Sequence, residues 1–369
     1  YNYLGETLYK MGKSEEAEKS LLKAIKIQPN LAKSYYILSK LKLLNKNIAW
    51  KDYLLSENIL INQQEEDLVN IYFARAYILE QKGDFIQASI NLEKANNLNR
   101  KINGSDYSEL SLDIKHFDQT WETNNSDSNQ TNKLPVPIFI VGMPRSGKTI
   151  TESILSYNNK LTKLGEDNSL FNAINIFLEK KDDLIKKNLY KLYIENIASE
   201  HLNKSFISTT TPLNLVYTGL IVSQIRNAHI IYCYRNPLDN IMELYKKNLG
   251  TRHTYSSSII ESASLWIESH SLMRKYKEKY NSKIYFMDYD KLVSQPEEEI
   301  KALLYWLGWD FDLKYLTPTL DPTTIGYSRI SKSEIIKKDF LGSWKNYREL
   351  LTPAIKILDK SPLYNDSIN

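Results

Sequence analysis

The stretch Pro135–Ser156, PVPIFIVGMPRSGKTITESILS, decides the fold of this chain. It opens with Ile138–Val141, a short apolar run rich in β-branched residues, which predicts a buried strand. The tight loop Gly142–Gly147 follows, and Lys148 begins a segment with apolar residues at helical spacing. A strand, a glycine-bounded loop and a helix start in this order predict an anion cradle, because backbone N–H groups and the helix dipole converge there.

As a motif, residues 142–149 fit the pattern G-x-x-x-x-G-K-T of a P-loop, which holds a phosphate group. Arg145 and Lys148 add two cations to the backbone donors of this loop. An ordinary strand–loop–helix turn is the structural alternative, but such turns rarely need two glycines, an arginine, a lysine and a threonine at this spacing. The sequence therefore predicts a phosphate cradle and leaves the identity of the phosphate open.

The overall composition narrows the class of protein. A chain of 369 residues is long for one core and predicts two or three domains. The net charge of +4 gives no reason to expect nucleic acid, and no apolar run approaches the roughly 20 residues that cross a bilayer. The five histidines and the single Cys233 show no metal-ligand spacing, so we expect no metal. One cysteine allows no intrachain disulfide, which favours a reducing, cytoplasmic compartment.

The region from Tyr1 to Arg100 shows a repeating helical pattern. Aromatic, small and turn residues fall at the positions typical of the tetratricopeptide repeat, a unit of about 34 residues: Tyr1, Leu4, Gly5, Gly12, Ala17, Leu21, Ala24 and Pro29, and again Tyr72, Ala76, Gly83, Ala88, Leu92 and Ala95. Between them, Tyr35–Leu44 predicts one helix and Ile48–Asp67 a lengthened partner. The chain starts inside a repeat and without methionine, so we expect sequence upstream. Binding of a peptide or protein partner and a purely scaffolding role are equally open for these repeats.

The remaining chain divides into a bridge and a second domain. Ser108–Phe117 predicts a bridging helix, and Trp121–Lys133 is a polar linker by composition. We therefore expect an N-terminally truncated repeat domain over residues 1–107, a bridge over 108–134 and an α/β domain over 135–369. In the last, β-rich runs at 138–141, 160–164, 206–208, 229–234 and 283–287 alternate with helical segments at 183–198, 213–223, 255–280 and 297–307. This alternation predicts three layers around a parallel sheet, with ligands at the carboxyl ends of the strands.

Three stretches that follow predicted strands carry candidate site residues. Glu166 is a carboxylate beside the cradle that fits a general base for a hydroxyl, and a helix cap made by Glu166 or Asp167 is the alternative. The threonines at 209–211 precede a proline and are expected to cap a helix. Arg235 can bind a phosphate through two parallel hydrogen bonds, and an ion pair with Asp239 is its alternative.

These pieces in this order resemble the sulfotransferases that use 3′-phosphoadenosine 5′-phosphosulfate (PAPS). More specifically, the chain resembles bacterial proteins in which tetratricopeptide repeats precede a domain similar to tyrosylprotein sulfotransferases. The resemblance covers nearly the whole chain and includes PIFIVGMPRSG, the Gly165-Glu166 turn, TPLN, YCYRNPLDN, YDKLVSQPEEEI, LLYWLGW and GSWKNYRELLTP. MPRSG and YRNPLDN, followed by WKNY, are specific as a set, whereas any one alone is weak.

The resemblance implies a role for each matching residue. The donor's 5′-phosphosulfate would be held by the loop residues Pro144, Arg145, Ser146, Gly147, Lys148 and Thr149. Arg235 would bind its 3′-phosphate, and Ser328 would lie near the leaving phosphate. Glu166 would take the proton from the acceptor hydroxyl, while Arg145 and Lys148 stabilise the charge that develops at the transferred group.

The chain also departs from the pattern of the family. Lys148 stands where the family usually has threonine, Thr210 where it has lysine, and Glu243 where it has serine. The segment 326–333 keeps Ser328 but loses an arginine from its usual place.

Two of these departures have candidate compensations. Lys148 is a candidate to replace the cation lost at Thr210, and Arg329 or Lys332 to replace the missing arginine. Glu243 has none, since a carboxylate beside a phosphate costs about 1 kcal/mol in water at 4 Å unless it turns away or pairs with the lysines at 246 and 247.

Three functions are therefore compatible with the sequence. The leading one is a PAPS-dependent sulfotransferase that acts on a hydroxyl of a sugar, peptide or small molecule. The second is a catalytically impaired member of the same fold that binds partners through its repeats. The third reads the loop as a nucleoside-triphosphate site of a kinase or ATPase, for which Asp288 would have to help hold Mg²⁺. Trp306 and Trp309 are expected to belong to the core.

Overall fold

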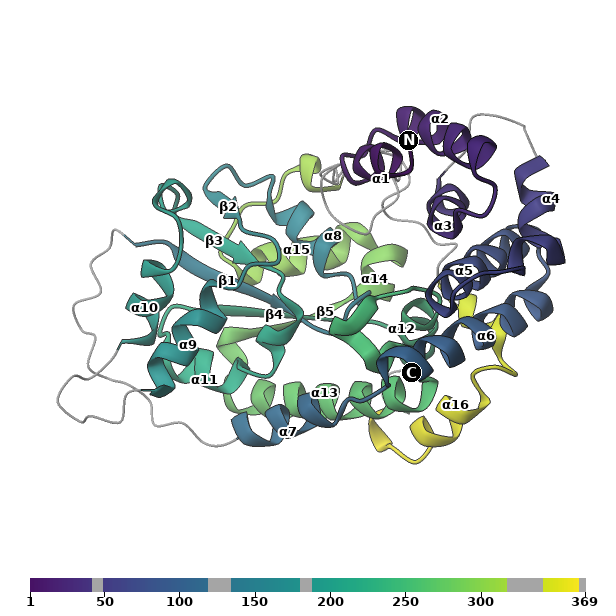
Figure 1. Ribbon diagram of the computed structural model, residues 1–369. Coiled ribbons are helices and arrows are strands. Elements are labelled where there is room, and N and C mark those ends of the chain that lie inside the picture. Colours follow the sequence, from purple (N-terminus) through teal and green to yellow (C-terminus); the bar gives the residue numbers. More distant parts are fainter. Residues whose placement is uncertain (42–48, 119–133, 180–187, 317–340, 365–369) are drawn as a thin grey trace.

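The computed structural model describes residues 1–41, 49–118, 134–179, 188–316 and 341–364. Helical hairpins stack in the first part of the chain, and the second part is a parallel sheet between layers of helices (Figure 1). Both predicted fold classes are therefore confirmed.

The repeat helices are α1 (Asn2–Lys10), α2 (Ser14–Ile27), α3 (Ala32–Lys40), α4 (Ala49–Leu55), α5 (Glu65–Gln81) and α6 (Phe85–Asn103). Gly5 permits the close contact between the first two helices, because a Cβ atom there would lie 2.6 Å from Cγ of Leu21. The prediction of one lengthened helix over 48–67 is wrong. Arg75 from α5 donates hydrogen bonds to the carbonyl oxygens of Leu54 and Ser56, which satisfies the end of α4 and stops that helix.

The bridging helix α7 (Ser108–Phe117) has the predicted bounds. It packs on the long helix α13 (Ile259–Lys279), where the hydroxyl of Tyr276 donates to the carbonyl oxygen of Phe117 over 3.2 Å. Lys275 of α13 also forms an ion pair of 2.8 Å with Asp118. Helix α7 therefore packs as part of the second domain.

Five parallel strands form the sheet: β1 (Val136–Val141), β2 (Leu161–Lys163), β3 (Phe206–Thr209), β4 (His229–Tyr234) and β5 (Ile284–Asp288), in the order β2-β3-β1-β4-β5. Alternate residues of the strands enter two cores, with Phe139 and Val141 on one face of the sheet and Ile138 and Ile140 on the other. A strand buried on both faces is apolar throughout, which explains the continuous run in β1.

The remaining helices of the described residues pack around the sheet, except α16, which packs on α13. They are α8 (Lys148–Leu155), α9 (Ser169–Glu179), α10 (Leu189–Glu195), α11 (Thr218–Gln224), α12 (Pro237–Tyr245), α14 (Tyr289–Ser294), α15 (Pro296–Trp306) and α16 (Thr352–Leu358). The helix predicted over 255–280 begins only at Ile259, because the side chain of Ser258 accepts from the backbone of Glu261 and caps it. The one predicted over 213–223 is a 3₁₀ turn followed by α11.

The last repeat and the α/β domain share one hydrophobic core. Val69 and Phe73 of α5, with Leu92 of α6, belong to the same cluster as Phe139 and Val141 of β1. The repeats are thereby held in a definite position beside the sheet. Trp306 and Trp309 pack in the core on the opposite face of the sheet, as predicted.

Candidate active site

The loop between β1 and α8 forms a narrow cradle whose backbone only glycine permits. Gly142 has φ 142°, and a Cβ atom there would lie 2.2 Å from the carbonyl oxygen of Cys233. Gly147 has φ 102°, and its Cβ would lie 2.6 Å from the ring of Tyr289. Arg145 itself adopts a left-handed conformation with φ 68°, which is uncommon for a residue with a side chain. The sequence spacing of the two glycines thus has a direct steric reason.

Polar groups line this cradle. The buried hydroxyl of Ser146 has no hydrogen-bond partner among the residues that the structure describes. A buried hydroxyl in a glycine-bounded loop at a helix start suits an oxyanion ligand, so the loop fits the phosphate end of a nucleotide. Pro144 and Thr149 are half-buried in the same loop.

The ammonium of Lys148 binds the loop from within. It donates to the carbonyl oxygens of Gly142 and Met143, each over 2.9 Å. Burial lowers the pKa of Lys148 to about 8, while the neighbouring Glu166 acts in the opposite direction. Lys148, which the sequence predicts to contact a phosphate, is therefore hydrogen-bonded to its own loop. Its pKa of about 8 means that the ammonium loses its proton just above neutral pH.

The Gly165–Asp167 turn is held by threonines of the next strand. The Thr209 hydroxyl donates to the carbonyl oxygen of Gly165 over 3.0 Å. The Thr211 hydroxyl donates to the carbonyl oxygen of Asp167 over 2.6 Å and accepts from its N–H over 2.9 Å. Two of the three hydroxyls that were predicted to cap a helix, those of Thr209 and Thr211, therefore bind the backbone of this turn.

The two acidic residues of this turn have different surroundings. Asp167 accepts hydrogen bonds from the N–H and the hydroxyl of Ser169, at 3.1 and 2.7 Å, and so supports the start of α9. Glu166 is exposed, and its charge acts on the pKa of Lys148. The Asp167 carboxylate therefore supports the start of α9, whereas Glu166 stays exposed at the same turn.

Arg235 lies at the carboxyl end of β4 and is only 4% exposed. Its guanidinium lies 3.9 Å from carboxylate oxygens of Asp239 and Asp290, and 4.8 Å from the centre of the Tyr289 ring. The same ring contacts Gly147, so a single side chain joins the arginine to the cradle.

The alternative role of Arg235 is an ion pair with Asp239, but the shorter contacts of that carboxylate are with another segment. The Asp239 carboxylate accepts from the backbone N–H groups of Gly342 and Trp344, at 2.7 and 2.9 Å, and from the hydroxyl of Ser343. Asp239 therefore anchors the closing GSW segment on α12, and its contact with the arginine is the longer one.

Helix α12 lies next to both parts of the candidate site, the loop around Arg145 and the segment of Arg235. Near its start the side chain of Asn240 donates to the carbonyl oxygen of Pro144 over 2.9 Å. One turn later Glu243 lies 3.7 Å from the guanidinium of Arg145. Burial alone would raise the pKa of Glu243, but Lys246, Lys247, Arg145 and Arg235 lower it to about 2. The charge of Glu243 is thus influenced by both arginines, and its carboxylate lies 3.7 Å from Arg145.

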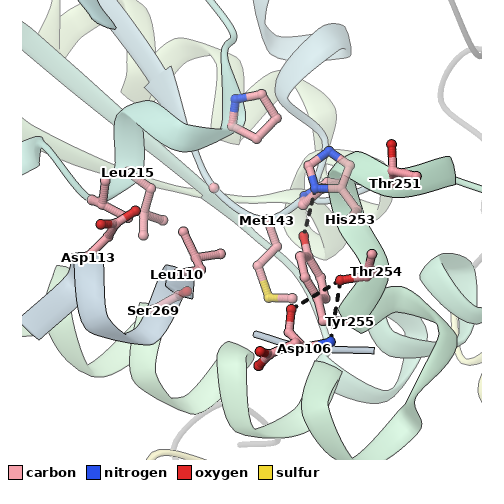
Figure 2. Close-up of a pocket in the computed structure, with 14 residues that line it drawn as sticks. Asp106, Leu110, Asp113, Met143, Leu215, Thr251, His253, Thr254, Tyr255 and Ser269 are labelled. Atoms are coloured by element: carbon pink, nitrogen blue, oxygen red, sulfur yellow. Dashed lines mark hydrogen bonds between the residues drawn. The ribbon is translucent and has the colours of Figure 1, made fainter. Parts of the chain in front are cut away.

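A cavity of about 270 Å³ adjoins the cradle (Figure 2). Met143 stands at its centre in the view, with Leu110 and Asp113 of α7 on one side and His253 and Tyr255 on the other. The Tyr255 hydroxyl and Nδ1 of His253 are 3.3 Å apart. Thr251, His253, Thr254 and Tyr255 of the polar and aromatic segment at 250–258 line this cavity, together with residues of the bridging helix.

Two other sequence predictions concern Ser328 and Asp288. Ser328, with the whole segment 326–333 that contains Arg329 and Lys332, lies outside the described residues. Asp288 caps α14 by accepting from the N–H groups of Asp290 and Lys291, at 2.9 and 3.2 Å. Its strand β5 pairs with β4, two places from β1, which disfavours a Mg²⁺-binding role beside the cradle.

Other candidate sites are few in the described part of the chain. It contains no group of three His, Cys, Asp or Glu side chains that could hold a metal ion. None of its helices is both long and apolar enough to span a membrane.

Comparison with known proteins agrees with this geometry. Residues 137–313 match the sulfotransferase family, and residues 1–31 and 69–102 match the tetratricopeptide repeat. Residues 137–313 are therefore similar to sulfotransferase domains, and segments similar to tetratricopeptide repeats precede them in the chain.

Individual relatives are distant. An uncharacterized protein of Aquifex aeolicus is 25% identical over 384 aligned residues, which cover 97% of this chain and 50% of the relative, so the chain spans about half the length of that protein. Similar solved structures include the sulfotransferase domain of a Synechococcus olefin synthase, 16% identical with a TM-score of 0.44, covering 66% of this chain and 98% of that domain. A mouse sulfotransferase complexed with PAP is 15% identical with a TM-score of 0.38, covering 63% and 87% of the two chains.

Proposed function

We propose that this protein transfers a sulfuryl group from PAPS to a hydroxyl of a sugar, peptide or small molecule. The observation that carries the proposal is the contact that links the loop around Arg145 to the guanidinium of Arg235. Tyr289 contacts both Gly147 and Arg235, and Glu243 lies 3.7 Å from Arg145 while Arg235 also lowers its pKa. A ligand with two separate phosphate ends suits such an arrangement, and the match of residues 137–313 to the sulfotransferase family supports this donor.

The residues of the chain then have the following parts. The loop at 142–149 binds the 5′ end through its N–H groups, the Ser146 hydroxyl and Arg145, while Arg235 binds the 3′-phosphate. When bound, PAPS supplies a sulfuryl group whose bond to the 5′-phosphate oxygen breaks as a bond to the acceptor oxygen forms. Glu166 accepts the proton of the acceptor hydroxyl, and Arg145 with Lys148 stabilises charge on the departing phosphate.

The acceptor side of the proposal rests on the cavity in Figure 2. Met143 and Leu110 give it an apolar wall, and His253 and Thr254 give it groups that can bind a hydroxyl. Its volume of about 270 Å³ suits one ring or side chain at a time, such as a sugar or the hydroxyl-bearing residue of a peptide. Peptide or protein binding by the repeats and a cytoplasmic location complete the proposal.

Titration calorimetry with adenosine 3′,5′-bisphosphate tests the donor site. We expect saturable binding at micromolar concentration that weakens as salt is raised, because several charges meet the ligand. Absence of binding at millimolar ligand would remove the donor site. Stronger, magnesium-dependent binding of ATP would favour the triphosphate alternative instead.

A catalytically impaired descendant is the second candidate, and the position of Glu243 favours it. We expect Glu243→Ser to strengthen bisphosphate binding by about tenfold or more, since it removes a carboxylate that lies among four cations. The isosteric Glu243→Gln is a matched control for charge and should act in the same direction. Unchanged affinity in both variants would show that Glu243 does not impair the site, and turnover by the unmodified enzyme would refute loss of activity.

The pKa of Lys148 predicts how binding depends on pH. A lysine whose pKa is lowered to about 8 is charged below that pH and loses its charge above it. We therefore expect bisphosphate affinity to fall as pH rises through 8, to about a tenth of its neutral value by about pH 9. Lys148→Met should bind more weakly, with a flat profile between pH 7 and 9. A flat profile in the unmodified protein would contradict this assignment.

A further inference from the structure

The end of helix α12 is fixed to the repeats. The buried side chain of Asn96, from α6, donates to the carbonyl oxygen of Tyr245 over 2.9 Å. The N–H of Asn248 donates to the hydroxyl of Tyr36, from α3, over 3.2 Å. The start of the same helix is hydrogen-bonded to the loop at 142–149. One helix therefore contacts both the repeats and the loop that is proposed to bind the donor.

Four charged side chains form a series of contacts along this helix, from the repeats to the loop. The carboxylate of Glu80, from α5, lies 2.6 Å from the ammonium of Lys246. The same ammonium lies 3.8 Å from the carboxylate of Glu243, which in turn lies 3.7 Å from the guanidinium of Arg145. None of the four side chains is more than 29% exposed, so water and salt screen these charges less than they screen surface pairs.

Lys246 is shared unequally between the two carboxylates. It donates a hydrogen bond to Glu80, whereas its contact with Glu243 is longer than a hydrogen bond. Burial raises the pKa of Glu243, and Lys246 is the foremost of the cations that oppose this effect. The adjacent Lys247 also faces both carboxylates, since each of them acts to raise its pKa against burial. An ammonium that is held closely by Glu80 neutralises Glu243 less completely, because the pair has less net charge to offer a second partner.

We propose that Glu80 of the repeats is a positioning residue for the donor loop: by holding Lys246, it leaves more of the negative charge of Glu243 directed at Arg145. That charge weakens the attraction of the guanidinium for a phosphate oxygen, because a carboxylate and a phosphate repel each other. Without the charge of Glu80, Lys246 can approach Glu243, and Arg145 then binds an oxyanion more strongly. The repeats would thereby set the donor affinity of the α/β domain. The identity of the donor rests on the proposed function.

The test measures the affinity of the full chain for adenosine 3′,5′-bisphosphate by calorimetry. We expect Glu80→Gln to strengthen binding by about threefold and Lys246→Met to weaken it by about threefold or more. Glu16→Gln removes the same charge from an exposed position of α2 and should leave the affinity unchanged. A merely structural role for Glu80 predicts weaker binding in Glu80→Gln, because damage to the junction does not improve a site. Unchanged or weaker binding in Glu80→Gln would therefore overturn the inference.

A second comparison asks whether Glu80 acts through Lys246. In the Lys246→Met background we expect Glu80→Gln to change the affinity by much less than threefold, since the intermediate ammonium is gone. An equal gain in both backgrounds would show that Glu80 acts only through space, and would contradict the proposed series of contacts. Glu243→Gln is a second background in which the gain should also disappear, and it replaces Lys246→Met if that variant does not fold.

Unfolding in urea gives a measurement that does not depend on the donor. If Glu80 and Glu243 share Lys246, the double variant Glu80→Gln/Glu243→Gln leaves this buried ammonium without either carboxylate. The shift of its unfolding midpoint should then exceed the sum of the shifts of the two single variants. If no variant binds the bisphosphate, the proposed donor fails, while the larger shift would still establish the link between the repeats and Glu243. Additive shifts would overturn the inference whether or not the donor binds.

Discussion

Glu166→Gln is expected to reduce sulfuryl transfer by about 10²–10⁴-fold while leaving bisphosphate affinity unchanged, because general base catalysis contributes that much and the side chain is not placed among the donor-binding groups. The variant removes only the basicity of the carboxylate. The side chain is exposed, and its turn is held by the threonines at 209 and 211, so the fold should be unaffected. The measurement is release of adenosine 3′,5′-bisphosphate from PAPS with a panel of hydroxyl-bearing acceptors.

Two controls make this result specific. Glu195→Gln changes an exposed glutamate of α10 in the same way and should leave turnover intact. Calorimetry on Glu166→Gln reports whether the donor still binds. Wild-type turnover in Glu166→Gln would dismiss it as the base and direct attention to His253, which lines the cavity beside the cradle.

Arg235→Ala is expected to weaken bisphosphate binding by about a hundredfold or more. The guanidinium is the buried cation at the end of β4, and a bidentate contact with phosphate is among the stronger hydrogen-bonded interactions in proteins. The variant should also lose about 3 kcal/mol of stability, because Asp239 and Asp290 would keep their charges in buried surroundings without it. Burial already raises the pKa of Asp290, and removal of the arginine would raise it further.

The pH dependence separates this stability loss from the loss of binding. An aspartate whose folded pKa lies above its unfolded value destabilises the protein as pH rises, so Arg235→Ala should melt closer to the unmodified protein at pH 5 than at pH 8. Arg235→Lys keeps the charge and should fold normally, yet bind the bisphosphate more weakly because a point charge replaces the planar fork. Unchanged affinity in Arg235→Lys and Arg235→Ala would place the 3′-phosphate elsewhere.

Local sequence patterns predicted much of the architecture. The helix at 108–117 has the predicted bounds, and the five strands lie within one or two residues of the predicted runs. These features depend on hydrophobic periodicity and on residues that end strands and helices, and both can be recognised within a short stretch of sequence. The lengthened helix over 48–67 was mispredicted because Arg75, far along the chain, satisfies the carbonyl groups that end α4.

The sequence by itself determined the glycine-bounded loop, the parallel sheet, the repeats and the positions of Arg145, Glu166 and Arg235 along the chain. Only the tertiary structure decided how these residues are supported. It placed the Tyr289 ring in contact with both the loop and Arg235. It also made Asp167, and not Glu166, the residue that supports the start of α9, and it placed Glu243 near cations that include Lys246. Each of these contacts joins segments that are remote in sequence, and such pairs are selected by the packing of helices on the sheet, which no local pattern encodes.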